Sequence, residues 1–498
     1  MKPENQSLLP AFFALWKSQE RRGRIALIGP QREITYPELH DEVGTLAGKL
    51  RAAGILRGAR VAIAMERTEA AIVALLAVLT AGAVPWMLEP NLGGNELRRR
   101  LSMTRIAWLL LDDANEGELA LEDLPTLTHL KVDELSEADP YWDLNIGGEA
   151  PALLLFTSGS SGKPKGVLQS HRGVLGNASG VAEATGLQPE DRLLHIMPLF
   201  HTNGINNQIL APLLAGASIA MAGRFKAENM PDWIARYQPT IVTGVPTIFS
   251  RMLPVDFPPE TLTSVRMLRC GSAPITEEQY RRVEQKFGKP LVLSYGLSEA
   301  TCTSTLNPPA APRLGSVGRP LPGQRVEILD SRGVLLTEPD SEGEVCISGP
   351  TLMLGYIDEQ SEGLPKPPGP RLASGDLGYL DQDGYLFLTG RKKEVIIRGG
   401  ENISPGLIES VLIKVPGVEA VCVVAKHDAD LGEVPFAFVV KTEGSEGKAL
   451  SSEVMSAAVE SELSRIHRPA GYQYLDRLPE NSVGKVDRKR LAESLADL

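Results

Sequence analysis

Apolar positions along the first three hundred or so residues switch repeatedly between helical and strand-like spacing. Tyr36 to Ala53 carries four apolar residues at helical spacing, and Arg60 to Met65 has the pattern of a strand. Further strands are predicted at residues 192–197, 240–242, 265–269 and 291–294, and several of them run straight into Gly, Ser or Pro. Strands that alternate with helices predict an α/β fold with largely parallel sheets and ligand loops at their carboxyl ends.

The spacing changes after residue 315. Between Gly315 and Thr389, short strands are broken by Gly and Asp, which predicts a small antiparallel or barrel-like unit. Beyond Arg391 a compact α+β pattern follows, with strands at 421–425 and 435–440 and a helix at 451–467. We therefore predict a large domain over residues 1–390 and a small one over residues 391–498, with the boundary at the charged turn 390–393.

One segment, Ala70 to Leu88, is apolar enough to suggest a membrane span. It is rich in alanine and contains Thr80, Gly82 and Pro85. These residues favour a buried helix that turns at Gly82 into a short strand. The first six residues lack the basic and apolar sequence of a signal peptide.

Composition and charge fit an ordinary globular protein with a large core. The 498 residues are 43% hydrophobic and 23% charged, and the net charge is −11. An acidic balance gives no general attraction to nucleic acid or to an anionic membrane, so an anionic ligand needs a local site. The four cysteines are widely spaced, which favours free thiols in a reduced, cytoplasmic setting over zinc ligation.

Candidate chemistry begins with a loop that follows the apolar run 152–155. Its Gly, Ser and Thr residues can bring backbone N–H groups and hydroxyls close to an oxyanion, and a lysine adds charge. Pro164 follows Gly162-Lys163, so the loop lacks the Gly-Lys-Ser/Thr end of the common nucleotide-triphosphatase loop. The expected phosphate-binding residues are Thr157, Ser158, Gly159, Ser160, Ser161, Gly162 and Lys165.

Four later segments add groups that suit a nucleotide. Tyr295-Gly296 ends a strand and is followed by Glu299, a hard oxygen ligand for Mg²⁺. Asp376 lies in a tight turn, where a carboxylate can accept the hydroxyls of a ribose. Segments 389–405 and 481–488 concentrate charge and glycine. Each segment alone also fits packing, an ordinary turn or a solvated face.

Together, in this order and spacing, the five segments resemble the acyl-adenylate-forming superfamily of acyl-CoA synthetases, peptide-synthetase adenylation domains and beetle luciferase. The resemblance begins near Ile34-Thr35-Tyr36 and runs to Lys485, so it covers essentially the whole chain. It implies a mobile C-terminal domain and two half-reactions. A carboxylate attacks the α-phosphate of MgATP to give an acyl-adenylate and pyrophosphate, and a thiol then displaces AMP to give a thioester.

The resemblance also implies roles for single residues. Glu299 would hold Mg²⁺, Asp376 and Arg391 the ribose, and Lys485 would bridge the carboxylate and the α-phosphate. The adenine slot and the α-phosphate neighbourhood would be formed by Gly271, Ser272, Ala273, Tyr295, Gly296 and Ser298.

For the second half-reaction, the resemblance makes Lys393 the hinge of the small domain. Gly399, Gly400 and Glu401 would line the tunnel for the thiol of CoA or of a carrier protein's phosphopantetheine. The chain departs from the family's usual Pro-x-Glu-x-Glu at Leu407, which stands in place of the first acid. This change puts the local packing in doubt more than the chemistry.

The resemblance places the acyl pocket around His201, Thr202, Asn203, Asn207 and Thr303. Amino-acid-activating members carry Asp where this chain has Thr202, so an ammonium would lack a counter-charge, which costs more than roughly 2 kcal/mol. No Arg or Lys lies between Pro198 and Gly223 to meet a second carboxylate. We therefore expect a monocarboxylic acid with an uncharged tail. The amides of the segment either line the pocket or cap a helix.

Three functions stay open. An acyl-CoA synthetase is favoured, because the sequence stops soon after Lys485 without an appended carrier domain. An adenylating enzyme that loads a separate carrier protein would use the same tunnel. The third option is a catalytically inactive nucleotide-binding protein or a luciferase-like oxygenase, against which the intact Glu299, Asp376 and Lys485 argue. The sequence leaves open whether the protein is a monomer or a homodimer.

Overall fold

The computed structural model describes residues 6–90, 92, 94–112, 127–158, 164–358, 365, 368–399, 401–480 and 485–495. A nine-stranded sheet has the order β15-β14-β13-β12-β11-β9-β10-β1-β2. The strands from β13 to β1 run parallel, β2 and β14 run antiparallel to them, and β15 pairs antiparallel with β14. The strands are β1 (Ile25–Ile28), β2 (Glu33–Thr35), β9 (Arg192–His195), β10 (Ser218–Met221), β11 (Ile241–Gly244), β12 (Met267–Gly271), β13 (Leu291–Tyr295), β14 (Thr305–Leu306) and β15 (Arg319–Pro320). This confirms the predicted parallel sheet.

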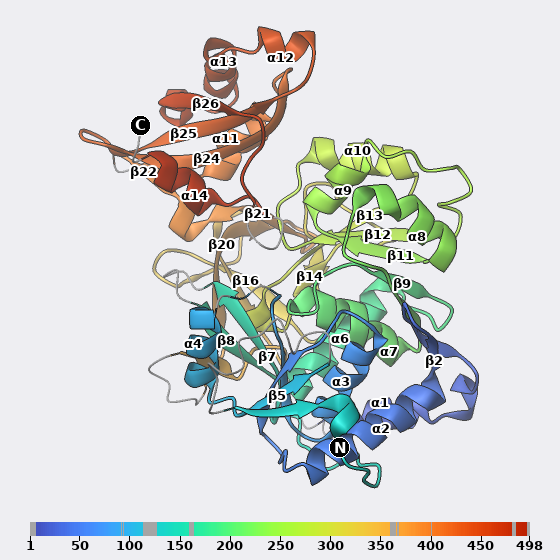
Figure 1. Cartoon of the computed structure of the whole chain (residues 1–498). Coiled ribbons are helices and arrows are strands. Elements are labelled where there is room, and N and C mark those ends of the chain that lie inside the picture. Colours follow the sequence, from blue (N-terminus) through green and yellow to red (C-terminus); the bar gives the residue numbers. More distant parts are fainter. Residues whose placement is uncertain are drawn as a thin grey trace.

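Helices cover both faces of this sheet (Figure 1). Side chains alternate across a strand, so Ile241 and Met267 belong to one core while Val242 and Leu268 belong to the other. The first core is covered by α1 (Leu8–Trp16), α6 (His171–Thr185), η5 (Asn203–Leu210) and α7 (Ala211–Ala215). The second is covered by η6 (Ala227–Asn229), α8 (Met230–Tyr237), α9 (Pro246–Met252) and α10 (Glu277–Phe287).

A second, parallel sheet has the order β4-β3-β5-β6. It contains β3 (Arg60–Ala64), β4 (Val84–Met87), β5 (Trp108–Leu111) and β6 (Thr128–Lys131). The remaining helices of the first 134 residues are η2 (Gln19–Arg21), α2 (Tyr36–Ala52), α3 (Glu69–Thr80), α4 (Gly94–Thr104) and η4 (Val132–Glu134). Thr35 caps α2 in a reciprocal arrangement with Glu38. The predicted buried helix and strand after residue 70 are confirmed, and Gly82 makes the turn with φ +79°. In the described part of the chain, no helix combines the length and hydropathy of a membrane span.

Two antiparallel sheets complete the large domain. A hairpin of β7 (Pro151–Ser158) and β8 (Pro164–Ser170) pairs with β19 (Gly355–Ile357). The predicted antiparallel unit is confirmed as β16 (Arg325–Leu329), β17 (Leu335–Leu336), β18 (Gly343–Ser348), β20 (Leu372–Leu380) and β21 (Leu386–Arg391). The end of β21 leads the chain away from this sheet through η8 (Lys392–Glu394).

The C-terminal part is a separate α+β layer, drawn in orange and red in Figure 1. It consists of β22 (Ile396–Arg398), β23 (Glu401–Ile403), α11 (Pro405–Leu412), β24 (Val418–Asp428), β25 (Gly432–Lys441), α12 (Ser445–Ala449), α13 (Ser452–Glu462), η9 (Arg465–His467), β26 (Gly471–Leu475) and α14 (Arg488–Ser494). The predicted helix over 451–467 is too long, because the backbone at Ser464 is extended and only a short 3₁₀ turn follows. The domain boundary itself stays a prediction.

An ion pair joins the two parts: Nη2 of Arg251 in α9 lies 2.6 Å from Oε2 of Glu480. Glu409 is the acid that remains where Leu407 replaces the first acid of the family's Pro-x-Glu-x-Glu pattern. Glu409 accepts hydrogen bonds from the Val423 amide at 2.6 Å and from Arg488 at 2.6 Å. Leu407 is 38% exposed, so its apolar side chain replaces an acid at the surface and leaves the packing around Glu409 intact.

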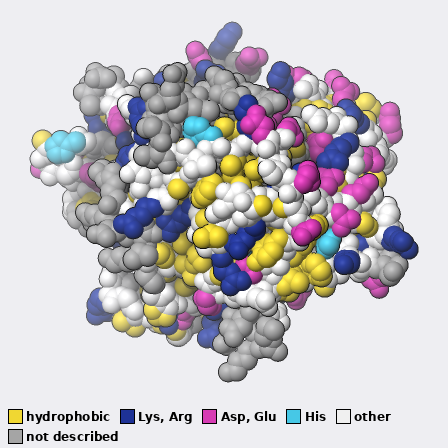
Figure 2. All heavy atoms as spheres, turned by 60° about the horizontal axis from the view of Figure 1, so that its bottom comes forward, with side chains coloured by type: hydrophobic (Ala, Val, Ile, Leu, Met, Phe, Trp, Pro, Cys, Tyr) yellow, Lys and Arg dark blue, Asp and Glu magenta, His cyan; other side chains and the backbone are white. Residues whose placement is uncertain are grey.

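Charge is mixed rather than segregated on the face shown in Figure 2. Lys and Arg side chains lie among hydrophobic ones in the middle of that face, and Asp and Glu gather toward one side. The net charge of −11 therefore does not appear there as a uniform acidic surface.

Candidate functional site

The expected phosphate-binding loop connects two antiparallel strands. Thr157 and Lys165 are paired across β7 and β8, next to the pair Ser158 and Pro164. The four residues between them that we expected to bind phosphate, Gly159, Ser160, Ser161 and Gly162, lie outside the described residues. The strands therefore hold the two ends of the loop side by side, with Lys165 at its C-terminal end.

Tyr356 connects this hairpin to the predicted metal ligand. Its ring, on β19, lies 4.8 Å from Nζ of Lys165, and its hydroxyl donates a 2.9 Å hydrogen bond to Oε1 of Glu299. Burial and the nearby Glu299 carboxylate raise the pKa of Tyr356, so it remains a donor. Glu299 lies in the short helix η7 (Ser298–Ala300). The Tyr356 hydroxyl bonds to only one of its two carboxylate oxygens, Oε1.

A second cluster joins three residues predicted for the base and the ribose. The Tyr295 hydroxyl, at the end of β13, donates a 2.7 Å hydrogen bond to Oδ2 of Asp376. Nε of Arg391 lies 2.9 Å from Oδ1 of the same carboxylate, across the β20–β21 ladder. Burial and the Asp376 charge raise the pKa of Tyr295. Asp376 is 7% exposed, so its carboxylate is oriented by two neighbours before any ligand binds.

The glycines near this cluster allow close backbone packing. A Cβ at Gly296 would lie 1.7 Å from the carbonyl oxygen of Cys302, and one at Gly271 would lie 2.7 Å from Oγ of Ser294. Ser272 follows with φ +69°, a conformation that non-glycine residues rarely adopt. Ala273 continues this turn and is half-buried. The backbone at Gly271, Ser272 and Ala273 forms a wall beside Tyr295, because Gly271 pairs with Ser294 across β12 and β13.

Lys485 reaches this cluster from the C-terminal part. Burial and the charge of Arg391 lower the pKa of its ammonium, while Asp376 opposes that shift. Burial and the positive charge of Lys485 lower the pKa of His201 to about 4. The ammonium is therefore within electrostatic reach of both the Asp376 carboxylate and the His201 ring, and His201 is neutral at pH 7.

Four of the five predicted acyl-pocket residues, all except His201, make side-chain hydrogen bonds, in two small groups. Asn207 donates to Asn203 at 3.0 Å and to Thr303 at 3.0 Å, and Asn206 donates to Thr202 at 2.8 Å. These amides lie in η5, a π-helix, and they bond to one another rather than capping a helix end. His201 stacks at an angle on Phe200, with ring centroids 4.5 Å apart, and its Nε2 has no hydrogen-bond partner among the described residues.

Gln169 joins the nucleotide side to the acyl side, and we did not predict this role from the sequence. Its amide nitrogen donates to the carbonyl of Ser298 at 2.9 Å, and its oxygen accepts from Asn206 at 3.1 Å. The side chain is fully buried in β8. A glutamine inside the otherwise apolar end of a strand was the available signal; Tyr356, also missed, pairs with Val167, two residues before Gln169, from β19.

The residues expected for the second half-reaction take part in none of the hydrogen bonds described above. Lys393 is exposed in η8, directly after β21. Gly399 has φ +57° and donates its amide to the carbonyl of Leu431 at 2.7 Å. Glu401 begins β23 and is exposed, while Gly400 lies outside the described residues. Nε of Arg488, three residues after Lys485, lies 3.5 Å from Oε2 of Glu394, so the turn with Lys393 contacts the segment that follows Lys485.

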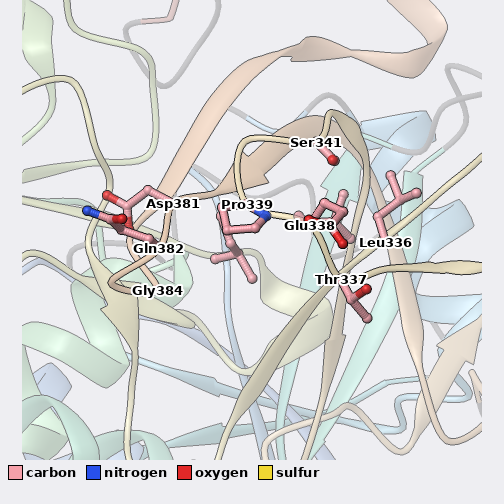
Figure 3. A pocket seen from close by; sticks show the side chains of 10 residues that line it. Leu336, Thr337, Glu338, Pro339, Ser341, Asp381, Gln382 and Gly384 are labelled. Atoms are coloured by element: carbon pink, nitrogen blue, oxygen red, sulfur yellow. The ribbon is translucent and has the colours of Figure 1, made fainter.

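A pocket of about 280 Å³ lies elsewhere, at the edge of the antiparallel unit (Figure 3). One side is lined by Leu336, Thr337, Glu338, Pro339 and Ser341, and the other by Asp381, Gln382 and Gly384. None of the residues singled out from the sequence lines it. In the described residues no group of three or more His, Cys, Asp or Glu is arranged to hold a metal ion, so Glu299 would bind one together with groups of a ligand.

Known proteins are similar to this chain over nearly its whole length. Among curated relatives, indoleacetate–CoA ligase of Aromatoleum aromaticum is 32% identical over 95% of this chain and 96% of its own length. Sulfoacetate–CoA ligase of Cupriavidus necator is 32% identical over 92% of both chains.

Two solved structures are similar over nearly the whole chain. ATP-bound MatB from Rhodopseudomonas palustris has a TM-score of 0.89 at 28% identity and covers 99% of both chains. O-succinylbenzoate coenzyme A synthetase from Bacillus subtilis, with ATP and a magnesium ion, has a TM-score of 0.82 at 29% identity and covers 98% of this chain and 99% of its own.

Family models match both parts of the molecule. Residues 15–357 match the AMP-binding enzyme model, and residues 407–485 match the model of the AMP-binding enzyme C-terminal domain. The resemblance read from the sequence is confirmed, and the chain belongs to the AMP-binding enzyme family.

Proposed function

We propose that this protein is an ATP-dependent acid–thiol ligase that activates a carboxylic acid as its acyl-adenylate and transfers the acyl group to CoA. The relatives named as CoA ligases support this activity. The observation that carries the proposal is the position of Lys485, a cation from the small domain beside Asp376 and His201. A carrier-protein thiol in place of CoA is the alternative acceptor.

In the adenylation step, the acid's carboxylate oxygen attacks the α-phosphorus of ATP and pyrophosphate leaves. Asp376, oriented by Tyr295 and Arg391, holds the ribose hydroxyls, and the wall at Gly271, Ser272 and Ala273 lies along the base. Lys485 neutralises negative charge that grows between the carboxylate and the α-phosphate. The hairpin with Thr157 and Lys165 holds the departing phosphates.

Glu299 fits a magnesium ion carried by the phosphates. Its carboxylate is a hard oxygen ligand. The Tyr356 hydroxyl holds Oε1 of this carboxylate, and Oε2 takes no part in that hydrogen bond. When bound there, Mg²⁺ would offset phosphate charge during the displacement. The solved relative with ATP and a magnesium ion supports this assignment.

The thioester step needs the thiol to approach the acyl carbon that Lys485 covers. We propose that the small domain turns about Lys393, so that Gly399, Gly400 and Glu401 replace Lys485 at the site. The thiol sulfur then bonds to the acyl carbon as AMP leaves. The exposed position of Lys393 between two sheets supports a hinge there.

The acid itself is defined only in part. Thr202 offers no counter-charge to an ammonium, so an α-amino acid remains disfavoured. The acids in the relatives' names differ at the end away from the carboxylate, which is an aromatic ring in indoleacetate and a sulfonate in sulfoacetate. The expectation of an uncharged tail rested on the absence of Arg and Lys between residues 198 and 223 alone. It is therefore not part of this proposal.

The test is an assay of AMP and pyrophosphate release with MgATP and a panel of acids, followed by addition of CoA or a phosphopantetheinylated carrier protein. We expect acid-dependent pyrophosphate release and a thioester with CoA. Asp376→Ala should weaken ATP binding in calorimetry without acid. Transfer to the carrier protein alone would favour the alternative acceptor, and a protein that binds no ATP would contradict the assignment.

A further inference from the structure

Arg269 is a buried cation that the adenylation chemistry does not use. It lies on β12, its side chain is 2% exposed, and neither its Nε nor its Nη2 has a hydrogen-bond partner among the described residues. Burial lowers the pKa of its guanidinium to about 10, so the group stays protonated at neutral pH. An unpaired buried charge is strongly unfavourable and calls for a counter-charge.

A partly buried arginine, Arg67, shows how this chain satisfies such a group structurally. Arg67 donates to the carbonyl oxygens of Ala222 and Gly223 and to His195. Burial lowers the pKa of both guanidinium groups to about 10. Only Arg67 bridges neighbouring backbone segments through hydrogen bonds that the described residues provide.

The position of Arg269 directs it toward the acyl pocket. It follows Met267 by two residues, so both side chains lie on the face of the sheet that η5 and α6 cover. Thr243 is its register partner on β11, and the Thr243 hydroxyl is also buried without a partner among the described residues. On η5 the fully buried Gln208 has neither amide atom paired within the described chain.

Cys302 connects Arg269 to the predicted pocket residues. The Thr303 hydroxyl donates to its Sγ at 3.9 Å, and Thr202, Asn207 and the Arg269 guanidinium all lie close enough to influence the pKa of the thiol. Arg269 therefore lies on the side of these residues that is closer to the sheet. An acid whose carboxylate meets Lys485 near His201 would extend past Thr202 and Thr303 toward Arg269.

We propose that Arg269 binds a second anionic group, a carboxylate or a sulfonate, at the end of the acid away from the reacting carboxylate. The planar fork of a guanidinium matches such a group with two parallel hydrogen bonds. The Thr243 hydroxyl and the Gln208 amide supply further donors on the same side. This specificity rests on the proposed ligase function, and it replaces the expectation of an uncharged tail.

The test compares acids of one carbon skeleton that end in a carboxylate, a sulfonate or a methyl group. We expect the natural protein to activate the anionic members at least tenfold better in kcat/KM for pyrophosphate release. Arg269→Met, which keeps a long apolar stem, should lower kcat/KM for the anionic members about 100-fold and leave or improve that for the methyl member. Arg269→Lys should recover part of the loss.

Two further measurements separate the possible outcomes. Calorimetric binding of the dianionic acid to the ATP-loaded protein reports on Arg269 even without turnover, and ATP binding alone reports on the ligase function. Arg269→Met should keep or raise the thermal midpoint of the ligand-free protein, whereas the matched Arg67→Met should lower it. A natural preference for the methyl member that survives Arg269→Met, or a loss of stability equal to that of Arg67→Met, would overturn the proposal.

Discussion

Lys485 is the residue on which the first half-reaction should depend most. Replacing it with alanine removes a cation from the place where negative charge grows, and we expect adenylation to slow by about 10²- to 10³-fold. Thiolysis of preformed acyl-adenylate should be spared. Pyrophosphate exchange measures the first step and thioester formation the second. Lys489→Ala, in the same terminal segment but exposed, is the matched control; unchanged exchange in Lys485→Ala would contradict the role.

At this scale the sequence predicted individual groups but not their partners. Tyr295, Asp376 and Arg391 stood out because each sits in a recognisable turn or strand end, and the structure joins them. Tyr356 and Gln169 did not stand out, because their partners Glu299 and Ser298 lie 57 and 129 residues away in sequence. A side chain whose function depends on such a long-range contact has no local pattern.

Among the elements, the short turn η8 carries the proposed hinge. Lys393→Pro fixes the backbone torsion φ near −65° and removes an N–H, so it should block the turn of the small domain. We expect thioester formation to be lost while adenylate formation stays measurable by pyrophosphate exchange. Lys393→Ala keeps the torsion free and should retain both steps. Equal loss of both steps in the proline variant would argue against a hinge at this residue.

Elements with strong periodicity were predictable, and those governed by tertiary contacts were not. The helix after Thr35 and the strand after Arg60 agree with the sequence pattern, because capping and alternation are local properties. The end of α13 and the π-helical form of η5 were missed. In η5 the buried amides pair with one another and with Thr303, a residue about a hundred positions away, so the local sequence does not reveal the geometry.

At the scale of the whole molecule, the ion pair between Arg251 and Glu480 holds the small domain in the arrangement that brings Lys485 to the site. The pair is partly exposed and should contribute about 0.2–1 kcal/mol. Arg251→Glu should therefore slow pyrophosphate exchange by up to about fivefold, and the double variant with Glu480→Arg should restore the rate. High salt should reduce the difference. A double variant slower than either single one would exclude this role.

Acid should destabilise the fold through three buried histidines. Burial lowers the pKa of His171 and His201 to about 4 and that of His195 below its usual value. Below pH 6.5 the unfolded chain takes up protons that the folded protein does not, so stability falls as pH falls, by about 1.5 kcal/mol for each of His171 and His201 from pH 6.5 to 5. Urea unfolding across this range measures the slope, and His171→Asn should make it shallower. Undiminished stability at pH 5 would contradict this account.

All four cysteines of the chain are buried, and burial raises the pKa of each thiol. An enzyme that forms an activated acyl group a few side chains away from Cys302 needs its own sulfur to remain a poor nucleophile, because a thiolate there would compete with CoA and leave the protein acylated. The native protein should therefore react with a thiol-specific reagent only as fast as it unfolds, and should not form mixed disulfides with oxidised CoA. A thiol that is labelled within seconds would contradict this protection.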